Sequence, residues 1–329
     1  MASVFVVVVN YRTGGLVVDC LASLASSAAD LRGGRVVVAD NDSGDGSVEV
    51  IRCAIDRRGW GGWAEVLALP HNGGFAYGNN AGVRCVRELD PGFGAVVMLN
   101  PDTIARPGAI GCLAAFLDSH AEVGIAGALI EDASGHVEVS AHADPSPLGE
   151  LEGAAKLGLL SRWLSRHAMH QDSISQHPCD WVSGACMAVR REALDAVGLL
   201  DEAFFLYFEE VDYCVRARRL GWSCWFVPEA RIVHFEGAAT GIRLARRRRP
   251  AYWYASRRRF FVKCYGVGGL LAADLLWALG RCSLVVRRAL RLGGRNGQAD
   301  EPEWLALDLL AGDFKALLSG ELRRIRKQV

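Results

Sequence analysis

Apolar runs and helically spaced apolar positions alternate between Val4 and Leu99, and this alternation predicts an α/β fold. Val4–Val9 is a continuous β-branched run, typical of a strand that is covered on both faces. Apolar residues from Leu16 to Leu24 then recur at helical spacing. Three more short runs predict strands: Arg35–Ala39, Glu65–Leu69 and Ala95–Leu99. This order of elements favours a mostly parallel central sheet.

Polar turns follow three of the predicted strands. They are Asp40-Asn41-Asp42-Ser43-Gly44, Pro70-His71-Asn72-Gly73-Gly74 and Asn100-Pro101-Asp102. The carboxyl ends of parallel strands share one edge of a sheet, which is where ligands bind in such folds. We therefore expect a ligand site at this edge.

The periodicity weakens in the middle of the chain. From about Glu131 to Pro178 the segment is rich in His, Ser and Pro, and we interpret residues 131–178 as a variable insertion that could cover an acceptor site. Regular patterns return with Trp181-Val182-Ser183-Gly184-Ala185. A helix is predicted from Glu209 to about Leu220, and a strand at Trp225–Val227.

The composition changes again after His234. Between Arg243 and Arg291 there are thirteen Lys or Arg residues and one acidic residue, Asp274. We therefore divide the chain into an α/β domain over residues 1–241 and a basic helical region over residues 242–329. The whole chain carries no net charge, so nothing at that level indicates a nucleic-acid partner.

Composition places the chain among globular proteins of the cytoplasm. Hydrophobic residues make up 51% of its 329 residues and charged residues 22%, which is enough for a sizeable core. The 10 cysteines are scattered and form no CxxC pair, as expected of free thiols in a reducing compartment. The apolar run at the N-terminus is too short for a signal peptide and lacks a basic segment before it.

Acidic residues in two of the turns are candidates for chemistry. Asp102 follows a strand, where a carboxylate can hold Mg²⁺ or Mn²⁺ together with substrate phosphates. Asp40 and Asp42 could accept hydrogen bonds from a nucleotide base or a ribose hydroxyl. Both turns are also ordinary Asx-turn sequences, so each has a purely structural interpretation.

Three other segments leave comparable alternatives open. The loop Asn72–Asn80 contains three glycines that allow close backbone approach to a ligand, but it lacks the basic residue of a phosphate-binding loop. Glu209, Glu210 and Asp212 either stabilise a helix N-terminus or supply a base whose pKa is raised by neighbouring aromatic rings. His234 is structural unless a metal site lies nearby.

The six motifs together, in this order, resemble the large inverting glycosyltransferase family 2. They are Asp40-Asn41-Asp42-Ser43, Asn72-Gly73-Gly74-Phe75, Asn100-Pro101-Asp102, Ser183-Gly184-Ala185, Glu209-Glu210-Val211-Asp212 and His234. The resemblance covers about Val4 to Gly241 and is greater to the rhamnosyltransferase-like branch. It implies a GT-A fold, a Mg²⁺ or Mn²⁺ cofactor and a sugar-nucleotide donor.

The resemblance also implies roles for individual residues. Glu210 would be the catalytic base with Glu209 as its competitor, and Asp102 and His234 would hold the metal. The implied nucleotide-sugar contacts are Asn10, Asp40, Asp42, Asn72, Gly74, Phe75, Asn80 and Asn100. The implied sugar or acceptor pocket is Trp181, Ser183, Gly184 and Asp212.

The resemblance to this family is the only basis for an expected donor and acceptor. The donor would be a dTDP- or UDP-sugar, with dTDP-rhamnose favoured, and the acceptor a glycan or glycolipid intermediate of a cell wall or surface polysaccharide. A small-molecule natural product is an alternative acceptor. A nucleotidyltransferase and a non-catalytic sugar-nucleotide-binding protein are alternatives from other functional classes. No nucleic acid is expected, because the Arg-rich region has no accompanying recognition motif.

The basic region predicts contact with a membrane. Phe260–Val286 is interrupted by Lys263, Asp274 and Arg281, and a spanning helix needs about 20 mostly apolar residues. We expect this region to lie on an anionic lipid surface without crossing it, so that the protein is cytoplasmic and peripheral on the inner face of the plasma membrane. The clustered arginines Arg246–Arg249 and Arg257–Arg259 would face lipid. The alternative is a helical pair packed on the α/β domain, with its arginines facing solvent.

Overall fold

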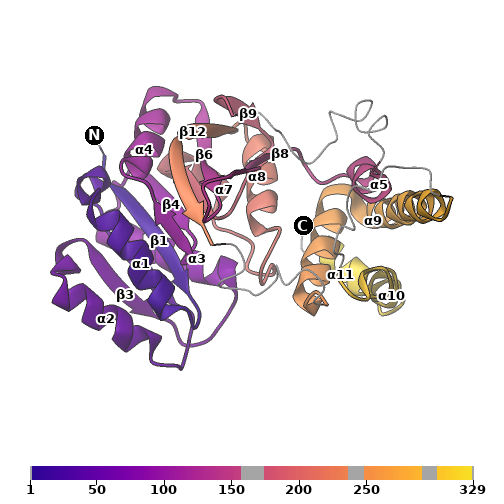
Figure 1. Ribbon diagram of the computed structural model, residues 1–329, viewed down its shortest axis with the longest axis horizontal. Coiled ribbons are helices and arrows are strands. Elements are labelled where there is room, and N and C mark those ends of the chain that lie inside the picture. The colour runs from indigo at the N-terminus through magenta and orange to yellow at the C-terminus, as the bar shows by residue number, and fades with distance from the viewer. Residues whose placement is uncertain (1, 157–173, 236–247, 291–301, 328–329) are drawn as a thin grey trace. The chain divides into compact units, whose positions relative to one another are not determined.

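The computed structural model describes residues 2–156, 174–235, 248–290 and 302–327 (Figure 1). They form two compact units, one over Met1–His142 and Gln171–Gly241, the other over Ala143–His170 and Ile242–Val329. The described residues 143–156 thus belong with the C-terminal helices, although the sequence pattern had placed them in an insertion of the α/β domain.

The first unit is built on a mostly parallel sheet, which confirms the predicted fold class. Its order is β3-β2-β1-β4-β11-β6-β12-β5, with β1, β2, β3 and β4 parallel to one another. β11 runs antiparallel to both β4 and β6, and β12 is parallel to β6 and antiparallel to β5. The bounds are β1(Val4–Asn10), β2(Val36–Asp40), β3(Ala64–Ala68), β4(Ala95–Leu99), β5(Thr103–Ala105), β6(Val123–Glu131), β11(Cys186–Arg190) and β12(Ser223–His234).

Helices cover both faces of this sheet. The bounds are α1(Gly14–Ala25), α2(Ser47–Arg57), α3(Phe75–Leu89), α4(Ala109–Ser119), α7(Arg191–Val197) and α8(Glu209–Arg219), with 3₁₀ turns at Ala28–Leu31 and Trp60–Gly62. Alternate residues of β1 enter two different cores: Val6 packs with α1, α2 and α4, whereas Val7 packs with α3, α7 and α8. Burial on both sides explains why this strand is apolar at successive positions.

Two short strands extend this sheet, and two others form a separate two-stranded sheet. β7(Val137–Glu138) pairs with β6, β9(His177–Cys179) pairs with β12, and β8(Ala141–His142) pairs with β10(Trp181–Val182). β12 is much longer than the predicted Trp225–Val227. Its pairing with β6 shifts register between Val227 and Arg231, around Pro228, which has no N–H to donate. The strand resumes beyond this irregularity and ends at His234.

The second unit is helical and contains α5(Pro147–Ala155), α9(Ala251–Ala289), α10(Leu305–Leu318) and α11(Glu321–Lys327). α9 is two helical segments, because Gly266 has a left-handed φ of 70°. The second segment lies close to α5: a Cβ at Gly280 would be 2.7 Å from the Leu151 carbonyl oxygen. Glycine at this position permits the two backbones to approach.

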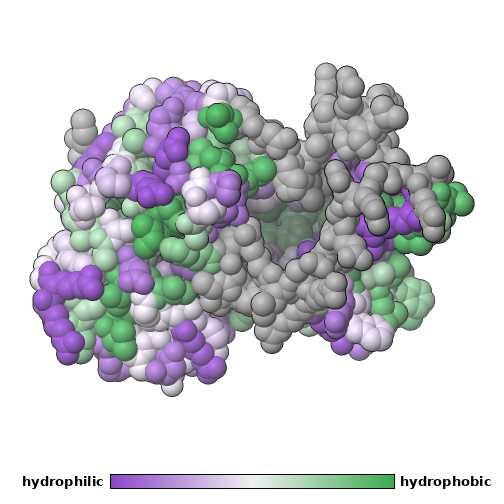
Figure 2. Space-filling view, viewed as in Figure 1, coloured by the Kyte–Doolittle hydropathy of each residue, from purple (hydrophilic) through white to green (hydrophobic). Residues whose placement is uncertain are grey.

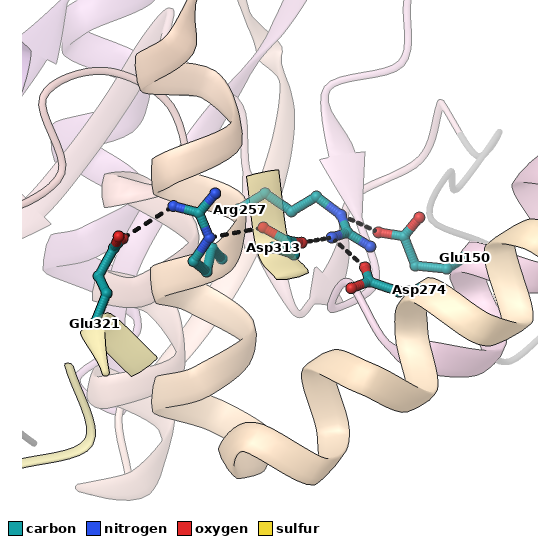
Figure 3. A network of polar contacts seen from close by, with 6 residues as sticks. Glu150, Arg257, Asp274, Asp313 and Glu321 are labelled. Atoms are coloured by element: carbon teal, nitrogen blue, oxygen red, sulfur yellow. Dashed lines mark hydrogen bonds and ion pairs between the residues drawn. The ribbon is translucent and has the colours of Figure 1, made fainter. Parts of the chain in front are cut away.

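A network of buried ion pairs connects all four of these helices (Figure 3). Arg257 donates to Glu150 of α5 at 3.0 Å, to Asp274 of α9 at 2.9 Å and to Asp313 of α10 at 3.3 Å. The neighbouring Arg258 donates to Asp313 at 2.7 Å and to Glu321 of α11 at 3.0 Å. The expectation that the cluster Arg257–Arg259 faces lipid or solvent is therefore wrong for its first two members, which are buried.

We expect Arg257→Met to destabilise the second unit by about 3–5 kcal/mol, because it leaves buried carboxylates without their cation. The matched control is Arg248→Met, since Arg248 makes an exposed ion pair with Asp308, and loss of such a pair should change stability far less. Hydrogen exchange of the α9 amides measures the difference. Equal protection in the two variants would contradict a stabilising role for the network.

Candidate active site

The predicted site motifs meet at one edge of the sheet because of its topology. Asn10, Asp40 and Leu99 end parallel strands there, and β6 and β12 run in the same direction, so His234 ends there too. β11 and β5 run the opposite way, so the residues that precede them, Ala185 and Asp102, lie at the same edge.

A compact set of hydrogen bonds shapes the Asp40 turn. The Asn10 amide donates to Asp40 Oδ2 at 2.6 Å and to Ser43 Oγ at 3.1 Å. The Ser43 hydroxyl also donates to Asp40 Oδ2 at 2.6 Å. Asn10 and Asp40 are both buried, whereas Asp42 is exposed and has a left-handed φ of 57°. Asp40 therefore holds the turn, and Asp42 is the acid that this turn presents to solvent.

Gly74 joins that turn to the segment before α8. The Asn41 side-chain amide donates to the Gly74 carbonyl at 2.8 Å, and Asn72 Oδ1 accepts from the Gly74 N–H at 3.0 Å. The Phe75 N–H donates to the Phe205 carbonyl at 2.7 Å. Gly74 has a φ of 90°, and a Cβ there would lie 2.2 Å from the Phe205 oxygen. Only glycine fits this contact without displacing the backbone.

Two residues that the resemblance assigns to the site also hold protein segments together. Asn80 is buried, accepts from the Leu200 N–H and donates to the Leu200 carbonyl, both at 2.9 Å. Asp212 accepts from Arg216 at 2.9 Å, and Arg216 in turn donates to the Val197 and Leu199 carbonyls. Both side chains therefore position residues 197–200.

Glu209 and Glu210 open α8 after two strained residues. Tyr207 and Phe208 have φ values of 71° and 70°, a conformation that costs non-glycine residues energy and is typical of functional sites. Glu209 is buried and Glu210 is half-buried. The side chain of Glu210 lies beside Gly184, where a Cβ would be 3.6 Å from the Glu210 carboxyl carbon.

Burial raises the pKa of both carboxyls. It raises the pKa of Glu210 to about 7. Burial and then the adjacent charge of Glu210 raise the pKa of Glu209 well above its usual range. A base must be able to lose its proton near the working pH, which suits a carboxyl whose pKa is raised towards neutrality. The position of Glu210 beside Gly184 favours it over Glu209 as proton acceptor.

Asp102, His234 and Asn100 form a polar cluster. The His234 Nε2 atom lies 3.2 Å from Asp102 Oδ1 and 3.4 Å from Asn100 Nδ2. Asp102 is only 3% exposed, but it lines a cavity of about 410 Å³ beside α1. The Phe235 N–H donates to the Asp102 carbonyl at 2.9 Å, which fixes the turn against the end of β12.

The donor atoms of this cluster fit part of a divalent-metal site. Two adjacent ligands about 2.1 Å from one octahedral ion lie about 3 Å apart, close to the observed 3.2 Å. Over the ranges that the structure describes, no group of three or more His, Cys, Asp or Glu is arranged to hold a metal. Two protein ligands are sufficient for Mg²⁺ when substrate phosphates and water complete the shell.

A turn at residues 183–185, the glycine turn, lies between this cluster and the pair Glu209 and Glu210. The Asn100 N–H donates to the Ala185 carbonyl at 3.0 Å, and the Ala185 N–H donates to the Ser183 hydroxyl at 3.3 Å. Trp181 of β10, which precedes this turn, stacks on His142 with ring centroids 4.0 Å apart. The sequence pattern indicated Phe205 only as one of the aromatic rings near Glu209 and Glu210. Its contact with Phe75 is made by a backbone carbonyl, which leaves no signal in residue type.

Comparison with known proteins gives one consistent family. A family model described as Glycosyltransferase like family 2 matches residues 2–254. N-acetylglucosaminyl-diphospho-decaprenol L-rhamnosyltransferase of Mycobacterium tuberculosis is 31% identical over 312 residues, which is 88% of this chain and 95% of the relative.

Solved structures agree at the level of the fold. Mannosyltransferase PcManGT of Pyrobaculum calidifontis, in complex with GDP-Man and Mn²⁺, has a TM-score of 0.53 at 15% identity, over 99% of this chain and 83% of that one. GalNAc-T7 with UDP, GalNAc and Mn²⁺ has a TM-score of 0.51 at 14% identity; the match spans 71% of this chain and less than half of that one, 44%. The expected GT-A type of fold is confirmed.

We expect Gly74→Ala to destabilise the protein by about 3 kcal/mol and to reduce activity, because a Cβ displaces the Phe205 backbone that precedes the carboxyl pair. Gly46→Ala is the matched control. Gly46 also has a positive φ, of 87°, but faces open space, so we expect a loss of about 1 kcal/mol. Thermal unfolding compares the two, and an equal loss would contradict the importance of the Phe205 contact.

Proposed function

This chain belongs to glycosyltransferase family 2, and from that premise we propose that it transfers rhamnose from dTDP-rhamnose to a polyprenyl-diphosphate-linked intermediate of a cell wall or surface polysaccharide. The observation that carries the proposal is the hydrogen bond between Asn100 and Ala185, which joins the Asp102 turn to the turn at residues 183–185 beside Glu210. The name of the Mycobacterium tuberculosis relative supports both the sugar and the lipid-linked acceptor.

The proposed reaction is a single displacement with inversion. The Glu210 carboxylate accepts the proton of an acceptor hydroxyl, and that oxygen forms a bond to the anomeric carbon as the bond to the nucleoside diphosphate breaks. Asp42 and the Gly74 backbone would contact the nucleotide. Asp102 and His234 would hold Mg²⁺ or Mn²⁺, which neutralises negative charge on the departing diphosphate when bound.

The donor and acceptor are tested separately. Hydrolysis of a panel of dTDP-, UDP- and GDP-sugars without acceptor identifies the donor, and we expect dTDP-rhamnose to be turned over fastest. Polyprenyl-diphosphate sugars and soluble natural products are then compared as acceptors. Transfer to soluble acceptors alone would overturn the lipid-linked assignment while leaving the donor assignment intact.

We propose that the enzyme works in the cytoplasm and is peripheral on the inner face of the plasma membrane. The support is chemical: a sugar nucleotide is a soluble donor, whereas a polyprenyl-linked acceptor is confined to the bilayer. Such an enzyme must reach both phases from one side.

We expect kcat/KM to rise about tenfold per pH unit below pH 7 and then to level off, because Glu210 must be deprotonated and its pKa is about 7. Stability should change in the opposite direction. The native state holds this proton more tightly than the unfolded chain, so the free energy of unfolding falls as pH rises between about 4.5 and 7.

The variant Glu210→Gln keeps the shape of the side chain and removes its basicity. We expect transfer to fall by about 10²–10⁴-fold with donor affinity preserved, as measured by titration with dTDP-rhamnose. Glu209→Gln is the comparison variant and should retain transfer. If Glu209→Gln is the inactive one of the pair, the base is Glu209.

We expect Asp102→Ala to abolish metal-dependent turnover, because it removes the oxygen ligand that faces His234. Mn²⁺ affinity, measured by electron paramagnetic resonance in the presence of nucleoside diphosphate, should fall with it. Asp19→Ala is the control, since Asp19 of α1 lines the same cavity and is not a proposed metal ligand. Full activity in Asp102→Ala would remove the metal assignment.

A further inference from the structure

One face of the second segment of α9 is apolar and exposed. The α9 stripe consists of Leu271, Leu275, Leu279, Cys282 and Val286, all of them exposed. Their spacing of three or four residues places them along one side of the helix. Leu275 is 61% and Leu279 54% exposed, values unusual for leucines of a regular helix. Figure 2 shows apolar surface towards the end of α9 and over α10.

The opposite face of the same segment is also apolar, and it is buried by packing within the unit. Leu270, Ala273 and Leu284 are buried, and Gly280 lies against α5. Asp274 is buried beside Arg257, so the acid that interrupts the apolar sequence does not interrupt the stripe. The helix therefore has two apolar faces, of which packing within the unit covers only one.

The same unit exposes further apolar side chains on α10 and positive charges on α9 and α11. α10 exposes a second set of large apolar side chains: Leu307, Leu310, Phe314, Leu317 and Leu318, preceded by Trp304. Soluble proteins seldom leave contiguous apolar surface of this extent without a partner. Arg288 at the end of α9 and four residues of α11 supply exposed positive charge: Arg323, Arg324, Arg326 and Lys327.

We propose that the α9 stripe docks on the surface of an anionic lipid bilayer, with the helix lying in the plane of the interface. The inference rests on the proposed function, since a lipid-linked acceptor would bring the enzyme to such a surface. Charge complementarity supports it: Glu150, Asp274 and Asp313 are held inside by Arg257 and Arg258, whereas the cations of α11 remain outside.

Docking is favoured over crossing by the packing of α5. By length and composition α9 is long and apolar enough to cross a membrane, so the length criterion applied to the sequence does not exclude a span. Crossing would take α5, with Glu150 and its buried partner Arg257, into the hydrocarbon or strip it from Gly280. An in-plane helix keeps these contacts and still buries its free face.

The alternative binding partner for the α9 stripe is a second copy of the chain. The stripe contains only Leu, Val and Cys and lacks the Trp, Tyr and Arg side chains that dominate protein–protein interfaces. This composition suits a lipid surface, which requires apolar area without specific pairing.

The test is flotation of the full-length protein with vesicles of phosphatidylcholine alone or mixed with phosphatidylglycerol. The variant Leu275→Glu/Leu279→Glu places two charges on the stripe, and Val50→Glu is the matched control, 51% exposed on α2 of the other unit. We expect wild type and control to float with anionic vesicles and to be released by alkaline carbonate. The double variant should bind at least about tenfold more weakly.

Donor hydrolysis without vesicles separates this inference from the proposed function, because it requires the active site and no membrane. It should be equal in all three proteins. Undiminished flotation of the double variant overturns the docking surface, and release by detergent alone indicates a crossing helix. A wild-type dimer that the double variant dissociates, without vesicle binding, assigns the stripe to a second copy.

Discussion

The pairing of β4 with β11 is the constraint on which the site depends. β11 runs antiparallel to β4, so the end of one strand lies beside the start of the other, and the Asn100 N–H reaches the Ala185 carbonyl. One backbone hydrogen bond thereby holds the turn that contains Asp102 against the turn at residues 183–185. If β11 were parallel to β4, residues 183–185 would lie at the opposite edge of the sheet, far from Asp102.

A second contact sets the position of the carboxyl pair. Gly74 allows the Asn72–Phe75 loop to meet the Phe205 carbonyl, and Tyr207 and Phe208 then turn the chain into α8 with left-handed backbone conformations. The resulting burial raises the pKa values of both Glu209 and Glu210, and the adjacent charge of Glu210 raises that of Glu209 further. Local strain and desolvation therefore produce a group that can exchange a proton near neutrality, which an exposed glutamate could do only at lower pH.

In the helical unit, charged side chains are paired with one another in the interior. Burying Arg257 among Glu150, Asp274 and Asp313 gains little stability over an apolar core, because desolvation offsets most of the attraction. Such a network specifies which faces of the helices meet. With the charges satisfied inside, the surface of this unit is dominated by apolar side chains and by the basic residues of α11, a combination suited to a lipid interface.

The sequence alone determined the first four strands of the first unit, the order of its motifs and the family, because hydrophobic periodicity and turn residues are local signals. It did not predict the later strands β6 and β11. Ala95–Leu99 is a strand with the predicted bounds, and the acid after it lies at the sheet edge as expected. What tertiary structure decided was the partner of each polar side chain. Asn80 and Asp212 belong to motifs yet bond to protein, and Arg257 lies in a basic run yet is 1% exposed. Residue type sets what a side chain can bond to, but the nearest complementary group comes from another part of the chain, and only folding brings the two together.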